Sequence, residues 1–210
     1  MPGLVGLGPR GLPGAARSVS RLGQFDDRFV GAALATKWHA NGIPAVSVAG
    51  RVLTLTANAR GDGIYQRPAQ MPAGARGAHY VAHFANNDMP GAMFGLVVLD
   101  GDGNGAGYSP YGDGNTYVWH VSHWGYAGTG QNNGSRPPLQ DYWLDLHASG
   151  TGGYAGRWGT GAWPHVRWEP CTRWDVPGTP APVLFGVAAI YGGATFPLTC
   201  QLTEFRVVSG

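Results

Sequence analysis

Charge is scarce in this sequence. Only 12% of the 210 residues are charged, and the formal net charge is +2. Lysine occurs once, at Lys37, beside 13 arginines, and glutamate occurs only twice, at Glu169 and Glu204. Because the arginines are scattered rather than gathered into a basic run, the sequence does not predict binding to nucleic acid. Low charge combined with many aromatic residues also excludes a disordered polyelectrolyte.

Long apolar runs and cysteines are equally scarce. The sequence has no run of 18 or more apolar residues, so it predicts no membrane span. Met1 is not followed by the basic stretch and apolar core of a signal peptide, so none is predicted. Cys171 and Cys200 are too few for a disulfide scaffold, and the sequence leaves open whether they are bridged.

Glycine and aromatic residues are abundant instead. The chain has 36 Gly, 16 Pro, 8 Trp, 9 Tyr and 7 Phe. A glycine inside a helix costs about 1 kcal/mol relative to alanine, so this glycine content argues against a helical bundle. The aromatic side chains are numerous enough to build a sizeable core. The composition therefore predicts an all-β fold rich in turns.

Several short segments show the patterns of β-strands. Apolar and polar residues alternate over residues 53–58 and 79–84, which is typical of half-buried strands. Residues 92–99 are continuously apolar, which suits a strand covered on both faces. Many short strands separated by Gly-, Asn- and Pro-rich turns predict one antiparallel sandwich or barrel over residues 25–210. We expect further strands near 116–124, 141–148, 165–169, 183–191 and 200–208, with turns at 101–105, 112–115 and 131–138.

Residues 1–24 differ from the rest and form a predicted extended N-terminal arm. Glycines at positions 3, 6, 8, 11 and 14 give an imperfect Gly-X-Y run, which resembles the repeat of the collagen triple helix. One interpretation is a flexible arm of the isolated chain. The other is an anchoring arm that becomes ordered among neighbouring subunits, most simply in a homotrimer. The residues expected to make these contacts are Leu4, Val5, Leu7, Arg10, Leu12, Arg17 and Arg21.

Both ends of the predicted sandwich resemble a known family. The segments FDDRFVGAALATKWHANG at 25–42, AVSVAGRVLTLTA at 45–57 and LFGVAAIYGGATFPLTCQLTEFRVVSG at 184–210 resemble the first and last strands of concanavalin A-like lectin/glucanase domains. This resemblance implies a jelly-roll of two antiparallel sheets. The residues that carry it near the N-terminus are Phe25, Asp26, Asp27, Phe29, Leu34, Trp38, Val46, Val48, Gly50, Leu53 and Leu55.

The collagen-like leader, the preference for arginine and the sandwich together resemble minor tail proteins of phages that infect actinobacteria. This resemblance implies a structural protein of the virion tail, attached to other virion proteins through the arm and contacting a cell-surface glycan. Two alternatives remain open at this stage: a polysaccharide-active enzyme similar to glucanases, and a capsid decoration protein without a ligand.

The catalytic motif of the glucanase branch is absent. That motif, Glu-x-Asp-x-x-Glu, places two carboxylates on one strand, whereas neither Glu169 nor Glu204 has an Asp two residues away. Asp141 and Asp145 share a predicted strand, but positions i and i+4 of a strand lie about 13 Å apart, too far for a retaining or inverting pair. From these absences we expect that the protein is not an enzyme.

Two further patterns suggest metal sites only weakly. Asp100, Asp102 and Asn104 begin like a calcium-binding loop, but the twelfth position is Tyr111 where the loop needs Glu. The simpler interpretation is a β-turn, and we predict no cofactor, with calcium as the alternative. His79 and His83 have the spacing of zinc ligands on a helix, but they lie in a strand pattern and are expected at a surface or interface.

The aromatic cluster is the best functional signal of the sequence. Seven of the eight Trp lie between residues 119 and 174, among His, Arg, Asp and Tyr. Flat sugar faces stack on aromatic rings while polar side chains bind the hydroxyl groups, so this mixture suits a glycan site. The segment 149–165 is too rich in Gly for a core strand, so we expect it to be an exposed loop. The predicted glycan-binding residues are Tyr154, Arg157, Trp158, Trp163, Trp124 and Tyr126.

Overall fold

The structure is a computed structural model that describes residues 23–42, 44–68, 77–87, 94–126, 131–149, 153–169, 172–175, 182–190 and 195–209. Within these ranges the chain forms strands and turns and no helix, which confirms the predicted all-β class. In the same ranges there is accordingly no helix long and apolar enough to cross a membrane. The predicted arm contacts of residues 4–21 and Cys171 lie outside the described residues.

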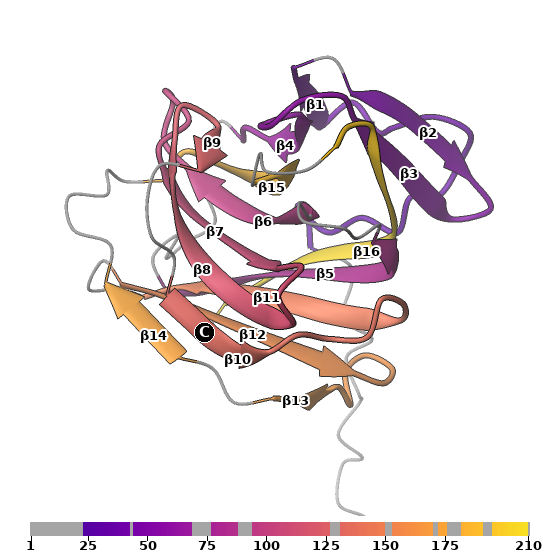
Figure 1. Ribbon diagram of the computed structural model, residues 1–210. Coiled ribbons are helices and arrows are strands. Elements are labelled where there is room, and N and C mark those ends of the chain that lie inside the picture. Colours follow the sequence, from indigo (N-terminus) through magenta and orange to yellow (C-terminus); the bar gives the residue numbers. More distant parts are fainter. Residues whose placement is uncertain are drawn as a thin grey trace, which may run out of the picture.

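The strands form two antiparallel sheets that pack face to face, as the jelly-roll expectation requires (Figure 1). Sheet B has the order β1-β4-β15-β6-β7-β8-β10, with β9 paired to β8, and sheet A has the order β13-β12-β11-β5-β16-β3-β2, with β14 paired to β12. The strands are β1 Trp38–Asn41, β2 Ala45–Ala49, β3 Val52–Ala57, β4 Gly63–Gln66, β5 Ala78–Asn87, β6 Phe94–Leu99, β7 Gly105–Pro110, β8 Asn115–Ser122, β9 Gly125–Tyr126, β10 Gln131–Ser135, β11 Tyr142–Ala148, β12 Gly153–Thr160, β13 Arg167–Trp168, β14 Thr172–Asp175, β15 Leu184–Ala189 and β16 Leu198–Ser209.

The core lies between the two sheets and follows the predicted alternation. Leu53, Leu55 and Ala57 of β3 point inward and are fully buried, while the threonines between them face outward. On β5, Tyr80 and Phe84 enter the same core, which leaves its histidines on the outer face. The strict period of two in these strands is what identified them in the sequence.

Strand β6 is buried on both faces, as its continuous apolar run predicts. Leu96 and Val98 belong to the main core between the sheets. Val97 and Leu99 belong to a second apolar cluster on the outer face of sheet B, together with Trp119 of β8. A strand covered on both sides has no polar face, and this explains its lack of alternation.

The expected exposed loop at 149–165 is wrong for residues 153–160, which form β12, whereas residues 161–165 form a turn. The glycines of β12 include positions where a side chain does not fit: a Cβ at Gly156 would meet the Tyr108 ring at 2.1 Å, and one at Gly159 would meet Val166 at 2.6 Å. Glycine therefore permits close packing here, across the sandwich at Gly156 and against the following turn at Gly159. The predicted turn at 131–138 likewise contains β10, an edge strand whose pairing with β8 shifts register between Asn132 and Ser135.

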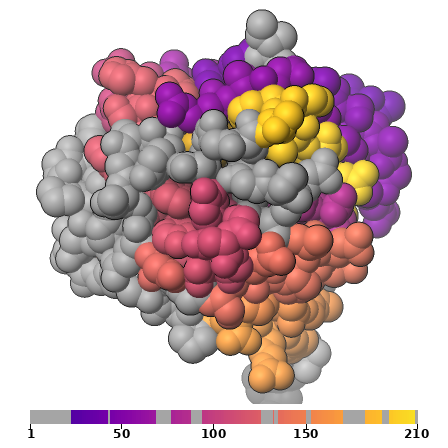
Figure 2. Space-filling view, in the orientation of Figure 1, coloured from indigo at the N-terminus to yellow at the C-terminus, as the bar shows by residue number. Residues whose placement is uncertain are grey.

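Both ends of the described chain meet on sheet A. Asp27 forms an isolated antiparallel bridge with Phe205 of β16, and the Asp26 carboxylate accepts a hydrogen bond of 2.9 Å from the backbone N–H of Val207. Trp38 donates from its indole to Asp27 at 2.8 Å. In the space-filling view, the C-terminal residues in yellow accordingly lie against the N-terminal residues in indigo and violet (Figure 2).

Candidate functional site

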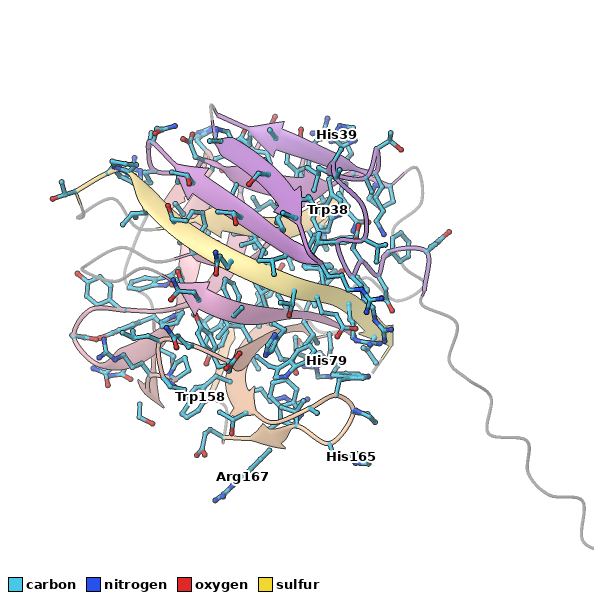
Figure 3. The ribbon with its side chains drawn as sticks, turned by 90° about the vertical axis from the view of Figure 1, so that its right-hand side faces the viewer. Trp38, His39, His79, Trp158, His165 and Arg167 are labelled. Atoms are coloured by element: carbon cyan, nitrogen blue, oxygen red, sulfur yellow. The ribbon has the colours of Figure 1, made fainter. Side chains whose placement is uncertain are left out.

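A groove of about 800 Å³ lies on the outer face of sheet A. Strands β5, β11 and β16 supply its floor, and the turn between β12 and β13 supplies one wall. In Figure 3 the strands of sheet A are in front, with His79 on β5 and with His165 in the turn that forms this wall. The groove is lined by Arg28, His83, Asp141, Trp143, Gly161, Ala162, Trp163, Pro164, Thr203, Glu204 and Arg206.

Two tryptophans form the aromatic part of the groove. The rings of Trp143 and Trp163 have centroids 5.6 Å apart at an interplanar angle of 45°. Trp143 is only 3% exposed, and its indole N–H donates to the carbonyl of Gly161 at 2.8 Å, which fixes both the ring and the turn above it. Trp163 is half-buried and presents the more accessible ring.

A charged wall stands beside the tryptophans. Arg28 donates from Nε to Glu204 at 3.2 Å, and Arg206 forms a second ion pair with the same carboxylate. The Arg206 guanidinium also lies 4.8 Å from the Trp163 ring centroid, which is a cation–π contact. Asp26 adds a further negative charge at 3.9 Å from Arg206. Glu204 is therefore held between two arginines, of which Arg206 is buried.

Asp141 and His83 form the opposite part of the groove. Asp141 is exposed, and its backbone is in the left-handed region with φ 53°. Among the described residues, none makes a hydrogen bond or ion pair with its carboxylate. His83 shares a hydrogen bond of 2.6 Å with the Thr203 hydroxyl and packs against Trp143 at 4.7 Å. Burial lowers the pKa of His83 below its ordinary value, while the charges of Asp141 and Glu204 act in the opposite direction.

A second polar cluster lies further along β11, outside the groove lining. Asp145 is 1% exposed and accepts hydrogen bonds from Arg157 at 2.6 Å and His79 at 2.9 Å. The His79 ring stacks on His147 at 4.3 Å, and the Arg157 guanidinium lies 4.4 Å from the Trp168 ring centroid. Within the described ranges, no group of three or more His, Cys, Asp or Glu could hold a metal ion. The two histidines of β5 thus lie on the outer face in polar and aromatic contacts, as the strand pattern predicted.

A smaller hollow of about 540 Å³ lies where β1 and β4 meet the N-terminal segment. Its described lining includes Phe25, His39, Arg67 and Lys37, and among these described residues there is no tryptophan and no carboxylate. Lys37 is already engaged by the backbone carbonyls of Gln24 and Asp26. We therefore regard the groove on sheet A as the candidate site.

The residues predicted from sequence fall in different places. Trp163 lines the groove, and Arg157 lies on the same outer face but in the Asp145 cluster. Tyr154 is 1% exposed in the core, so the expectation that it is exposed is wrong: alternation along β12 turns it inward. Trp158 also faces the core, and its indole donates to the carbonyl of Ser135 at 2.6 Å.

The remaining two predicted residues belong to the other sheet. Trp124 is in the turn between β8 and β9, where its ring packs 5.1 Å from Tyr65 on the outer side of sheet B. Tyr126 contributes its backbone to β9. The structure therefore does not bring these two residues to the groove. Whether Arg157 and Trp163 bind sugar stays a prediction.

The loop proposed for calcium is a hairpin turn between β6 and β7. The Asp100 carboxylate accepts hydrogen bonds from the backbone N–H groups of Asp102 at 2.9 Å and Asn104 at 2.8 Å, and Gly103 has φ 79°. Partial burial raises the pKa of Asp100, but these hydrogen bonds outweigh it and hold the pKa below its ordinary value. Calcium binding stays an alternative, which the loop's use of Asp100 as a turn-forming acceptor disfavours.

Sequence reasoning missed most of the groove. Glu204 and Arg206 lie on one strand, but the register of β16 against β5 shifts between Gln201 and Glu204, so simple alternation does not assign their faces. Arg28 and His83 reach the groove from segments distant in sequence. The rarity of glutamate was the available signal, because one of only two glutamates lies here.

No protein-family model matches the sequence, and no curated protein matches it either. Solved structures do match. The GH43 BlXynB protein from Bacillus licheniformis aligns with TM-score 0.62 and 13% identity over 90% of this chain and 40% of that chain. The VIP36 exoplasmic/lumenal domain in its Ca²⁺/Man2-bound form aligns with TM-score 0.54 and 10% identity over 83% of this chain and 81% of that chain. A β-1,3-glucanase from Mycobacterium marinum aligns with TM-score 0.55 and 15% identity over 88% of this chain and 98% of that chain.

These likenesses correct one expectation and confirm another. The inference that the chain is not an enzyme is contradicted, because structures of this fold include glycoside hydrolases and the groove itself contains the carboxylates of Asp141 and Glu204. The glucanase motif places both carboxylates on one strand, whereas Asp141 immediately precedes β11 and Glu204 lies on β16. The chain spans only about two fifths of the GH43 protein, and identities of 10–15% concern the fold alone. That fold is a concanavalin A-like jelly-roll sandwich.

Proposed function

We propose that the groove on the outer face of sheet A binds carbohydrate. The observation that carries this proposal is the pair of tryptophans, Trp143 and Trp163, flanked by carboxylates, arginines and a histidine in one hollow. The apolar C–H face of a sugar ring packs against an aromatic ring, while the hydroxyl groups need hydrogen-bond donors and acceptors around it. A concave site with apolar walls and a few convergent polar groups provides both.

The likeness to a lectin-type structure supports the same proposal. The VIP36 domain was solved with Ca²⁺ and Man2 bound, and the β-1,3-glucanase is named for a polysaccharide. The alignment covers most of the length of each of these two chains, so the likeness extends over a whole sandwich in both cases. The groove described above is the part of this chain that offers the required chemistry.

Removal of the Trp163 ring tests the proposal. We expect Trp163→Ala to weaken binding to soluble laminarin or arabinogalactan at least tenfold in affinity electrophoresis, because a central aromatic anchor carries much of the binding energy. Its half-buried position should leave the fold intact. The matched control is Tyr117→Ala, which removes a half-buried ring from the outer face of sheet B and should not change binding. Absence of binding to any tested glycan, or equal binding by the Trp163 variant, would count against the groove.

A second candidate function is hydrolysis of the bound glycan. The specific observation in its favour is that Asp141 and Glu204 line the same groove, and glycoside hydrolysis uses two carboxylates that flank the bond to be broken. Release of reducing ends from laminarin, agarose or arabinogalactan measures this activity. We expect it to be lost in both Asp141→Asn and Glu204→Gln if the two carboxylates act as a pair.

The assembly in which the sandwich works is a further part of the proposal. The Gly-X-Y spacing of residues 1–24 supports an anchoring arm of a phage tail protein, present as a trimer and located in the virion. Deletion of residues 2–24 should leave a folded sandwich that no longer joins the particle. Mass spectrometry of purified virions would measure incorporation, and normal incorporation of the truncated chain would refute the anchoring role of residues 1–24. If the protein is found on the capsid and not on the tail, this location favours the alternative of a capsid decoration protein.

A further inference from the structure

Asp141 combines two features that bear on ligand binding. Its backbone is in the left-handed region, which non-glycine residues rarely adopt, although aspartate tolerates it better than most. Its carboxylate also has no hydrogen-bond or ion-pair partner in the described part of the chain, although it lines the groove. Sparsely populated backbone conformations occur frequently at ligand-binding sites.

The other non-glycine residues with positive φ have local explanations. Arg51 lies in the tight turn between β2 and β3, and His123 and Trp124 form the turn between β8 and β9. Phe29 donates its backbone N–H to the Asp27 carboxylate at 2.7 Å, a local turn closed by a side chain. Asp141 ends the bend at residues 139–141 that leads into β11. Among these residues with positive φ, Asp141 is the one that lines the groove.

The charges around the groove indicate what this side chain binds. Arg28 and Arg206 are both engaged by Glu204, and Asp26 lies close to Arg206. Among the described residues, Asp141 is thus the lining carboxylate that no arginine neutralises. An acidic sugar would bring its negative charge toward Asp141 and would be repelled. An uncharged sugar avoids this repulsion, and its hydroxyl groups supply the donors that a carboxylate without a partner accepts.

We propose that Asp141 determines the specificity of the groove by accepting hydrogen bonds from two neighbouring hydroxyl groups of an uncharged sugar. An ionised carboxylate only accepts hydrogen bonds and has two oxygens, so it matches a pair of hydroxyl donors in the way it matches the two N–H groups of an arginine. The sugar ring would at the same time stack on the tryptophans of the same groove. This inference rests on the proposed function and adds the class of ligand and the residue that selects it.

Three variants separate the roles of charge and backbone. Asp141→Gly removes the carboxylate and relieves the left-handed backbone, so we expect a melting temperature equal to or above that of the wild type and an affinity for laminarin at least tenfold lower. Asp141→Asn keeps a side chain that tolerates this backbone but replaces one acceptor by a donor, and it should also bind at least tenfold more weakly. His123→Gly is the matched control: it relieves a positive φ in the turn between β8 and β9 of the other sheet, and it should bind like the wild type.

The outcomes distinguish this inference from the proposed function. If the wild type binds no glycan, the proposed function fails and the inference fails with it. If Trp163→Ala abolishes binding to laminarin while both Asp141 variants bind like the wild type, the groove stands and the role of Asp141 is refuted. If the wild type binds chitosan oligomers or alginate more tightly than laminarin at low salt, the uncharged class is refuted. Loss of laminarin binding in both Asp141 variants, with unchanged binding by His123→Gly, supports it.

Discussion

Two aspartates four residues apart at the same strand of sheet A have opposite surroundings. Asp145, in the middle of β11, is 1% exposed and is held by Arg157 and His79. Asp141, immediately before the strand, is exposed and lacks such partners in the described chain. A buried charge must be paired to be tolerated, whereas a charge at the surface is solvated and needs no partner. The first carboxylate therefore belongs to the fold, and the second is available to a ligand.

The largest difference between the two aspartates should be in stability. Asp145→Asn removes the charge that pairs with Arg157 and His79, and breaking a buried ion pair in this way should lower the free energy of unfolding by about 3 kcal/mol. Asp141→Asn is the matched control and should change it by less than about 0.5 kcal/mol. Urea unfolding measures both. Equal destabilisation by the two substitutions would remove the distinction.

Glu204 provides an intermediate case, because it lines the groove and is also paired with two arginines. Its side chain is 15% exposed, and Asp26 remains near Arg206 when the charge of Glu204 is removed. We expect Glu204→Gln to lower the free energy of unfolding by about 1.5 kcal/mol, the scale of a hydrogen bond to a charged group. If Glu204→Gln lowers the free energy of unfolding as much as Asp145→Asn does, the role of Glu204 is to stabilise the fold and not to bind a ligand.

The smallest expected effect concerns pH. Burial lowers the pKa of His83 in the folded state below its unfolded value of about 6.5, so the unfolded chain binds the proton more readily. His83 should therefore reduce stability as the pH falls from about 6.5 toward its folded pKa, and should have no effect above that window. Urea unfolding between pH 5 and pH 8 should show this slope in the wild type and a weaker slope in His83→Gln. An unchanged slope would mean that His83 titrates normally.

Patterns within a single strand were readable from the sequence, and contacts between strands were not. The period of two identified β3 and β5, and the apolar run identified β6 with both faces covered. Strand β12 was missed because its glycines are explained only by neighbours that the fold supplies, the Tyr108 ring at Gly156 and Val166 at Gly159. The partnership of Asp145 with Arg157 and His79 depends on the register of three neighbouring strands, which spacing along one strand does not reveal.

The same limit applies to the candidate site. Trp163 was found because a tryptophan in a Gly-rich segment is conspicuous, and it does line the groove. Glu204 and Arg206 were not found, because the register shift in β16 moves them relative to β5. Tyr154 and Trp158 were assigned to the surface because a strand was taken for a loop, and alternation then places both on the core side.

The attachment of residues 25–29 to β16 has a mechanical consequence. The bridge between Asp27 and Phe205 and the hydrogen bond from Val207 to Asp26 fasten the start of the sandwich to a strand that has β5 on one side and β3 on the other. A pulling force applied at residue 23 would reach this interior strand first and would be shared with both neighbours. An edge strand such as β2 would instead peel away one hydrogen bond at a time. The sandwich is therefore connected at a point where tension passes to an interior strand of sheet A rather than to its edge.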